Sequence, residues 1–199
     1  MIRFFDLLFS FLGLLLLSPL FLLIAFLIVL DSRGGVFYRQ VRVGKDGVDF
    51  RLYKFRTMMA GAEKKGLITV GGRDPRITRT GYYLRKYKLD ELPQLLNVLS
   101  GDMSLVGPRP EVRKYVEMYT TEQARVLDVR PGITDYASIE YMDENEILGK
   151  AGDPDKAYVE LIMPDKIRYN MKYIEHRCAA EYFRIIFRTL YGIVGVRGQ

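Results

Sequence analysis

The apolar residues of this chain are concentrated near its start, where the run from Phe4 to Leu30 contains a single charged side chain, Asp6. A run of this length can form a helix that crosses the hydrocarbon core of a membrane. It is too long for the apolar part of a signal peptide. Ser18-Pro19 interrupts the run near its middle, and because proline lacks a backbone donor, a kink or break is expected there. We expect Asp6 to pair with a basic residue at the membrane interface.

Each half of the interrupted run has about 12 residues and would extend about 18 Å as a helix, which is less than the ~30 Å hydrocarbon core. Both flanks are basic, with Arg3 before the run and Arg33 soon after it. Positively charged flanks favour the cytoplasmic side. The pattern therefore favours a re-entrant helix-break-helix hairpin over residues 1–32, which enters and leaves the membrane on one face. A proline-kinked helix that spans the membrane is the alternative.

Residues 33–199 predict a second unit, a small α+β domain that is mostly helical. Alternating β-formers predict a short β-hairpin with strands at 36–43 and 48–55. Stretches rich in glycine, proline or acidic residues predict loops at 60–78 and 142–157. Helical spacing and capping signals predict helices at 79–88, 90–99, 111–127, 165–177 and 179–194.

The two C-terminal helices carry further signals. Asp165 follows Pro164 and is the expected N-cap of the first of them. The second combines aromatic and aliphatic residues with Arg184 and Arg188 on one stripe. This pattern is typical either of an amphipathic helix at a membrane interface or of a core helix, and it leaves both interpretations open.

The net charge of +6 is concentrated in two segments, because 33–56 carries seven basic residues against two Asp and 73–88 carries six against one. Such patches attract the phosphates of lipids, nucleotides or nucleic acids. The apolar segment and the lack of a recognisable nucleic-acid-binding motif argue against nucleic acid as a partner. The chain has one Cys, Cys178, and one His, His176. This excludes an intramolecular disulfide and argues against structural zinc, so any metal is expected to be a hard ion such as Mg²⁺.

The adjacent carboxylates Asp90 and Glu91 are the strongest candidates for catalysis. On their own they are good helix-start residues, since Asp caps a helix and Glu complements its dipole. Basic residues elsewhere favour a functional interpretation, because arginine binds phosphate oxygens with two hydrogen bonds. A carboxylate among such cations is expected to have a lowered pKa, and it can bind Mg²⁺ or attack phosphorus. The candidate phosphate-binding residues are Lys54, Arg56, Arg85, Arg109 in a Gly-Pro-Arg-Pro turn, and Arg130 in an Arg-Pro-Gly turn.

Four stretches of the chain form recognisable motifs. They are 53–58 (Tyr-Lys-Phe-Arg-Thr-Met), 89–94 (Leu-Asp-Glu-Leu-Pro-Gln), 101–110 (Gly-Asp-Met-Ser-Leu-Val-Gly-Pro-Arg-Pro) and 128–134 (Asp-Val-Arg-Pro-Gly-Ile-Thr). These stretches resemble the bacterial sugar transferases, the small monotopic polyprenyl-phosphate phosphoglycosyl transferases that begin capsule, O-antigen, exopolysaccharide and glycoprotein assembly. The resemblance runs in order over essentially the whole chain, and its longest block is the most specific.

The resemblance implies a reaction. Asp90 would attack the β-phosphate of a UDP-sugar, release UMP and carry the phosphosugar until polyprenyl (undecaprenyl) phosphate accepts it. Mg²⁺ would lie on Asp90 and the diphosphate, Glu91 would orient the site or act as a base, and the basic residues named above would hold phosphates. Ser18-Pro19 corresponds to the helix break of the family, which implies a re-entrant anchor at the cytoplasmic face of the bacterial inner membrane. Residues 33–199 would then form the catalytic domain.

The chain departs from many family members after Thr134, where they continue with glycine and this chain continues with Asp135. If residues 134–141 touch the sugar, its identity cannot be carried over from the family. The alternative function is that of a non-catalytic membrane-surface protein, which binds anionic lipids or a partner complex through its anchor and basic patches. That function explains the charge but not the carboxylate pair among rigid arginine turns. A homodimer is compatible with the sequence, although no residue argues for it.

Overall fold

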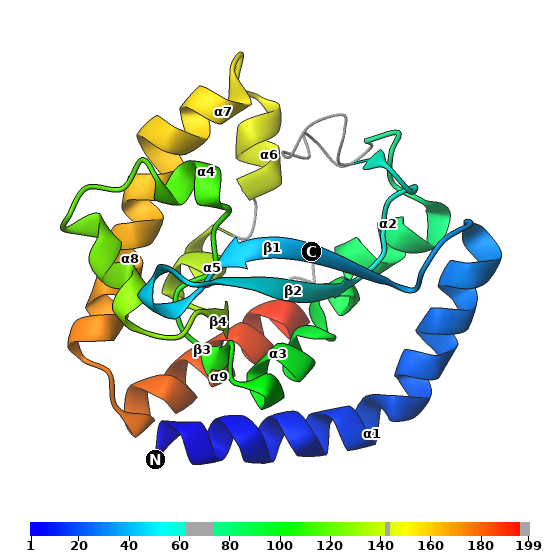
Figure 1. Cartoon of the computed structure of the whole chain (residues 1–199), viewed down its shortest axis with the longest axis horizontal. Coiled ribbons are helices and arrows are strands. Elements are labelled where there is room, and N and C mark those ends of the chain that lie inside the picture. The colour runs from blue at the N-terminus through cyan, green and yellow to red at the C-terminus, as the bar shows by residue number, and fades with distance from the viewer. Residues whose placement is uncertain (63–73, 142–143, 196–199) are drawn as a thin grey trace.

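The computed structural model describes residues 1–62, 74–141 and 144–195. A long helix, α1 (Ile2–Asp31), lies along one side of the molecule, and the other elements form a single body against its inner face (Figure 1). These elements are β1 (Phe37–Val43), η1 (Lys45–Gly47), β2 (Asp49–Phe55), α2 (Arg79–Lys86), η3 (Leu89–Glu91), α3 (Gln94–Ser100), β3 (Ser104–Val106), α4 (Arg113–Val116), η4 (Gln123–Asp128), β4 (Gly132–Thr134), α5 (Tyr136–Glu140), α6 (Glu144–Gly149), α7 (Pro154–Ala157), the π-helical η5 (Tyr158–Ile162), α8 (Met163–Glu175) and α9 (Ala179–Gly195). The predicted mostly helical α+β class is confirmed.

Helix α1 is continuous, with Pro19 inside it, and bends near its middle (Figure 1). Ser18 Oγ donates to the Leu15 carbonyl at 2.8 Å, next to the position where proline lacks a donor. The expected break is thus a bend within one helix. By length and composition α1 is apolar enough to cross a membrane, and its outward side chains are exposed large hydrophobics such as Leu16 and Phe26.

The inner face of α1 is held to the body by polar contacts near its start. The buried carboxylate of Asp6 accepts hydrogen bonds from Ser104 Oγ, Leu105 N and Tyr182 OH, each at 2.9 Å. The expectation of a basic partner for Asp6 is wrong, because the residue faces the backbone of β3, whose amide needs an acceptor. Arg3 instead donates to the last carbonyls of α3, with Val98 O at 2.7 Å, which is favourable at the negative end of a helix.

The predicted hairpin is confirmed as the antiparallel pair β1–β2, with Phe37 opposite Phe55 and Val43 opposite Asp49. Its turn places Asp46 and Gly47 at positive φ, 58° and 73°. Strand β2 packs on α3, where the Asn97 side chain accepts from Tyr53 N at 2.9 Å and donates to Arg51 O at 2.8 Å. These two bonds seat α3, and the turn that precedes it, against the hairpin.

A second, parallel pair of short strands was not predicted. Ser104 in β3 pairs with Gly132 in β4, and Val106 pairs with Thr134. Strands of three residues are too short to give a hydrophobic period. The two chain segments meet so closely that a Cβ on Gly107 would lie 2.4 Å from the Arg130 carbonyl oxygen, so this position requires glycine.

The predicted helices meet different outcomes. Those at 79–88 and 179–194 are confirmed by α2 and α9, and that at 90–99 by η3 and α3, ending at Gly101 with φ 99°. The single helix predicted at 111–127 is wrong: α4 and η4 are separate, because Thr120 and Gln123 exchange hydrogen bonds that start a new turn.

The C-terminal third is more helical than the sequence indicates. The loop predicted at 142–157 contains α6 and α7, while residues 142–143 lie outside the described part. Asp165 does not cap a helix, because α8 continues directly from η5. Of the loop predicted at 60–78, residues 63–73 lie outside the described residues.

Helix α9 has two apolar faces. Tyr182 and Ile185 are fully buried against Val106 and the start of α1. Phe187, Leu190 and Tyr191 are exposed. The helix is therefore a core helix on one side, and its other side is the kind of surface that the interfacial interpretation requires.

Candidate active site

The two candidate carboxylates lie at a junction between elements. Lys88 has positive φ (56°), which turns the chain out of α2. The 3₁₀ turn η3 then carries Asp90 and Glu91, and Pro93 caps the start of α3. Because this turn is anchored to the hairpin through α3, the two side chains have well-defined and different surroundings.

Glu91 is the centre of an ion cluster with Lys54 and Arg109, called here the Glu91 cluster. Lys54 Nζ lies 2.9 Å from Glu91 Oε1, and Arg109 donates to both carboxylate oxygens, with Nη1 to Oε2 at 3.1 Å. Burial alone would raise the pKa of Glu91, but Arg109 and then Lys54 hold it well below its ordinary value. Burial lowers the pKa of Lys54, and Glu91 opposes this shift. Glu91 is thus an ionised carboxylate already neutralised by two cations.

Asp90 is also buried but is not paired in this way. No hydrogen bond or ion pair reaches its carboxylate from the residues that the structure describes. Burial raises the pKa of Asp90, and Lys54 and Arg85 oppose this only through their charge. The predicted lowering of the carboxylate pKa is therefore wrong for Asp90 and right for Glu91. Sequence could not separate the two neighbours, because the difference depends on which way a single 3₁₀ turn directs each side chain.

The arginine of the Gly-Pro-Arg-Pro turn is held at its backbone as well as at its guanidinium. Arg109 N donates to the buried Asp135 Oδ2 at 3.0 Å. On the other side of the turn, Arg42 Nη1 donates to the Pro110 carbonyl at 3.0 Å and lies 3.5 Å from the Glu111 carboxylate. Sequence reasoning missed Arg42, Glu111 and Asp135 as supports of the site. Arg42 and Asp135 come to the turn from distant segments, and Glu111, which directly follows the turn, is identified only by its contact with Arg42.

The other predicted phosphate-binding residues differ in their surroundings. Arg85 is half-buried and acts on Asp90 through its charge. Arg130 is exposed, and its Nε donates to the Gly101 carbonyl at 2.8 Å. Arg56 is buried and donates to Ser32, Arg33 and Gly35, so its guanidinium is used to tie the end of α1 to β2. The structure thus brings together Asp90, Glu91, Lys54, Arg85 and Arg109.

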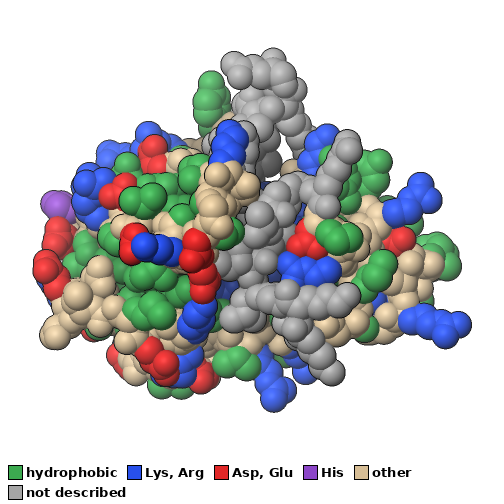
Figure 2. All heavy atoms as spheres, turned by 90° about the horizontal axis from the view of Figure 1, so that it is seen from above, with side chains coloured by type: hydrophobic (Ala, Val, Ile, Leu, Met, Phe, Trp, Pro, Cys, Tyr) green, Lys and Arg blue, Asp and Glu red, His purple; other side chains and the backbone are tan. Residues whose placement is uncertain are grey.

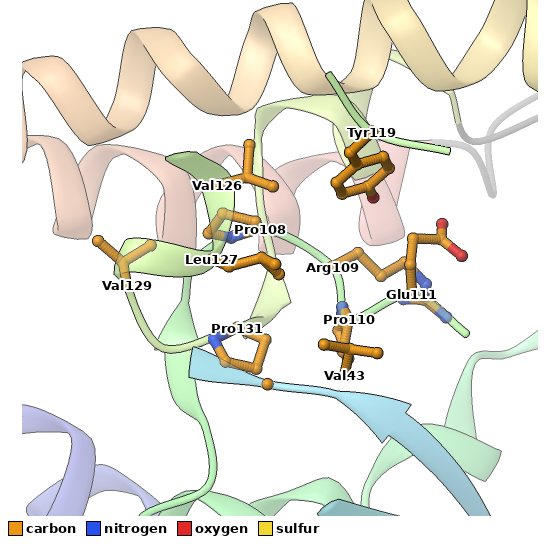
Figure 3. Close-up of a pocket in the computed structure, with 11 residues that line it drawn as sticks. Val43, Pro108, Arg109, Pro110, Glu111, Tyr119, Val126, Leu127, Val129 and Pro131 are labelled. Carbon is orange, nitrogen blue, oxygen red and sulfur yellow. The ribbon is translucent and has the colours of Figure 1, made fainter. Parts of the chain in front are cut away.

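Behind the turn lies a small cavity of about 20 Å³, lined by Pro108, Arg109, Glu111 and Tyr119 among others (Figure 3). This is room for about one water molecule, so the cavity is too small to be a substrate pocket. Seen from above, basic, acidic and apolar side chains are interspersed on the described surface (Figure 2). The distinctive electrostatic feature of the candidate site is the pair of cations around Glu91.

The described residues hold no group of three or more His, Cys, Asp and Glu side chains that could bind a metal by themselves. Mg²⁺ is usually held by one or two carboxylates together with substrate phosphates. Since Glu91 is already paired with cations, Asp90 is the carboxylate that fits such a shared site. The donor set suits a metal that arrives with a phosphorylated substrate.

A family model described as bacterial sugar transferase matches residues 1–195. An Aeromonas hydrophila protein, UDP-N-acetylgalactosamine-undecaprenyl-phosphate N-acetylgalactosaminephosphotransferase, is 39% identical over 93% of this chain. The exopolysaccharide production protein ExoY of Sinorhizobium fredii is 34% identical over 99% of it. The UDP-glucose:undecaprenyl-phosphate glucose-1-phosphate transferase of Escherichia coli is 35% identical over 94% of it. The chain spans 41%, 87% and 38% of the lengths of these three relatives.

Proposed function

Because this chain belongs to the bacterial sugar transferase family, we propose that it transfers a phosphosugar from a UDP-sugar to undecaprenyl phosphate, with Asp90 as the nucleophile. The observation that carries the proposal is the contrast between two adjacent carboxylates. Glu91 is neutralised by Lys54 and Arg109, whereas Asp90 is buried and unpaired among the described residues. A carboxylate of raised pKa is a better nucleophile once ionised than one stabilised by ion pairs.

The proposed reaction has two displacements at phosphorus. An Asp90 oxygen forms a bond to the β-phosphorus of the UDP-sugar while the bond to the bridging oxygen breaks, and UMP leaves with that oxygen. A phosphate oxygen of undecaprenyl phosphate then forms a bond to the same phosphorus, and the Asp90 carboxylate is regenerated. The two substrates can use one small site in turn, which suits a soluble donor and a lipid acceptor.

Each residue of the Glu91 cluster has a part in this reaction. Arg109 and Lys54 supply positive charge beside the phosphates, and Glu91 holds both cations in place. The lowered pKa of Glu91 makes it a poor proton acceptor, so we favour an orienting role over that of a base. Mg²⁺, held by Asp90 and the diphosphate, would supply further charge neutralisation.

We also propose that α1 is a re-entrant anchor at the cytoplasmic face of the inner membrane. Near the start of α1, Arg3 and Asp6 bond to α3 and β3. At its end, Asp31 accepts from Thr80 N of α2 at 2.8 Å. Because one body holds both ends, a spanning α1 would require that body to lie on both sides of the membrane. The bend at Pro19 supports entry and exit on the same face.

The relatives named above transfer different sugars, N-acetylgalactosamine and glucose, so both are candidates for the donor sugar of this chain. The test is release of UMP from protein purified in nanodiscs with Mg²⁺ and a panel of UDP-sugars, beginning with those two. Without undecaprenyl phosphate, we expect one equivalent of UMP and a protein mass increased by one phosphosugar; with it, we expect continuous turnover. If the chain is instead a non-catalytic lipid-binding protein, no UDP-sugar will yield UMP, and the Asp90→Asn variant will behave as the parent does.

A further inference from the structure

Gln94 is a buried residue in the candidate site that the reaction as described does not use. Its side chain is only 2% exposed, and it follows Asp90 by four residues and Glu91 by three. The amide nitrogen Nε2 has no hydrogen-bond partner among the described residues. Buried amides in native proteins nearly always have a partner, so this donor calls for an explanation.

The position of Gln94 follows from its neighbours along the helix. Residues three apart share a helix face, and Glu91, Gln94 and Asn97 have this spacing. The two outer residues both bond to β2, Glu91 to the Lys54 side chain and Asn97 to the Tyr53 amide. By this spacing we expect Gln94 to lie on the face of α3 that is turned towards β2, between these two residues.

The adjacent Glu91 cluster offers the Gln94 amide no free acceptor. Lys54 and Arg109 are cations and only donate, and the oxygens of Glu91 already accept from both of them. An apolar side chain of the same size would fill the space without an unsatisfied donor. An acceptor supplied by a ligand would satisfy this donor, and the phosphate oxygens of the substrate are acceptors of this kind.

We propose that Gln94 is a substrate-binding residue whose amide donates to an oxygen of the phosphoryl group that meets Asp90. This inference rests on the proposed function, since it takes the β-phosphate of the UDP-sugar as the ligand. A neutral donor at this position adds a hydrogen bond without a further charge. A neutral amide also leaves the Asp90 carboxylate unpaired, whereas an additional cation at this position would form an ion pair with it.

The test measures binding of UDP and UMP, and thermal stability, for the Gln94→Met variant in nanodiscs. We expect the affinity for UDP to fall about tenfold or more, as for loss of a hydrogen bond to a charged group. UMP lacks the β-phosphate, so its affinity should stay within about twofold. The melting temperature should be unchanged or higher, because a buried unpaired donor has been removed. Unchanged UDP affinity would overturn the proposal.

A matched control is Asn170→Leu on α8. Asn170 is also buried and also has an unpartnered amide atom, but α8 packs chiefly on α5, η4 and η5. This variant should change stability alone and leave UDP affinity as in the parent chain. If its UDP affinity falls as far as that of Gln94→Met, the effect is general and the assignment to Gln94 is wrong.

A second variant keeps the test decisive if Gln94→Met does not fold. Gln94→Glu has the same shape but sets an anion against the phosphate, so UDP affinity should fall further than in Gln94→Met. Failure of both variants to fold would make Gln94 a structural residue and overturn the proposal. If the parent binds UDP but releases no UMP, the proposed function fails while the affinity ratio still decides the role of Gln94. If the parent does not bind UDP, both fail.

Discussion

Arg109 and Glu91, which are 18 residues apart in the chain, form a two-point ion pair at the start of α3. The same arginine is held through its backbone by Asp135. The Gly-Pro-Arg-Pro turn is thereby fixed through both the backbone amide and the guanidinium group of Arg109. The orientation of Glu91 therefore depends on a residue that lies outside η3 and α3. Disturbing either contact should change the site without touching the nucleophile.

Glu91→Gln should destabilise the protein and reduce turnover. The neutral amide leaves Lys54 and Arg109 without their anion, which costs about 1–3 kcal/mol of unfolding free energy for largely buried groups. Because the folded-state pKa of Glu91 lies well below its ordinary value of 4.5, its contribution is fully present above that value and is lost as pH falls through the folded-state pKa. Chemical denaturation of parent and variant at pH 7 and in acid measures this difference.

The control for this prediction is Glu160→Gln. Glu160 is exposed and lies 3.9 Å from Lys156 on the helix surface, where ion pairs contribute little. Its stability should match the parent at both pH values. A difference between parent and Glu91→Gln that persists unchanged in acid would contradict the ionised state of Glu91.

Asp90→Asn should abolish turnover without lowering stability. The ionised form of Asp90 is disfavoured by burial, as its raised pKa indicates, so its contribution to stability decreases as pH rises, and a neutral amide removes this cost. UMP release and the melting temperature at pH 7 check the two parts. Asp46→Asn in the exposed hairpin turn, at φ 58°, is the neutral control. Turnover that survives in Asp90→Asn would reject the nucleophile.

The parts of the fold that follow from local sequence are those with a strong local signal. The hairpin has β-formers on both sides of Gly44–Gly47, and α3 ends at a glycine with positive φ. The helix predicted at 111–127 failed because the apolar Tyr119 and Val126 keep helical spacing across the polar Thr120–Gln123, where side-chain hydrogen bonds begin a new turn. The strands β3 and β4 are too short to show an alternation of apolar and polar residues. They are defined only by their pairing with each other, which joins residues 28 positions apart in the chain.

The candidate site divides in a similar way. Asp90, Glu91, Lys54 and Arg109 could be predicted because carboxylates and rigid arginine turns are visible in the chain. Arg56 could not be told from them, since only the fold shows that it binds the carbonyls after α1. The roles of Asp135 and Gln94 could not be predicted from sequence, although Asp135 was noted there as a departure from the family. The first acts through a backbone amide far away in sequence, and the second is notable only because it is buried without a partner.

Arg56→Gln tests whether this residue supports the fold or binds substrate. Its guanidinium donates to three backbone carbonyls and one hydroxyl around Ser32–Gly35, so the variant should lose about 2–4 kcal/mol of stability. The KM for the UDP-sugar should stay within about twofold, because four of the five N–H donors of the guanidinium group already bond to the chain. Arg51→Gln, at an exposed position on β2, the strand that Arg56 follows, should change neither quantity. A raised KM at unchanged stability would restore the phosphate-binding role predicted from sequence.

Asp135→Ala tests the support of the arginine turn. The change removes the N-cap of α5, worth about 1 kcal/mol, and also leaves the Arg109 amide without its acceptor. We expect kcat to fall about tenfold or more as Arg109 loses its fixed position. Asp153→Ala removes a comparable N-cap from α7 and should lose stability alone. Equal kcat values for the two variants would show that Asp135 acts only as a cap.

The re-entrant arrangement of α1 predicts that both of its ends face the cytoplasm. In a Cys178→Ser background, which removes the one exposed native thiol, a single cysteine is placed after Met1, at Arg33 or at Lys45 in the hairpin turn. All three should react with a membrane-impermeant maleimide in inside-out vesicles and none in intact spheroplasts, because Arg3 and Asp31 are tied to the same body as the hairpin. A cysteine at Leu16, which is 80% exposed near the bend, should be protected from both sides by lipid. Labelling of the Met1 position from the periplasmic side, with Arg33 and Lys45 labelled from the cytoplasm, would establish a spanning helix and require the contacts of Arg3 and Asp6 to open in the membrane.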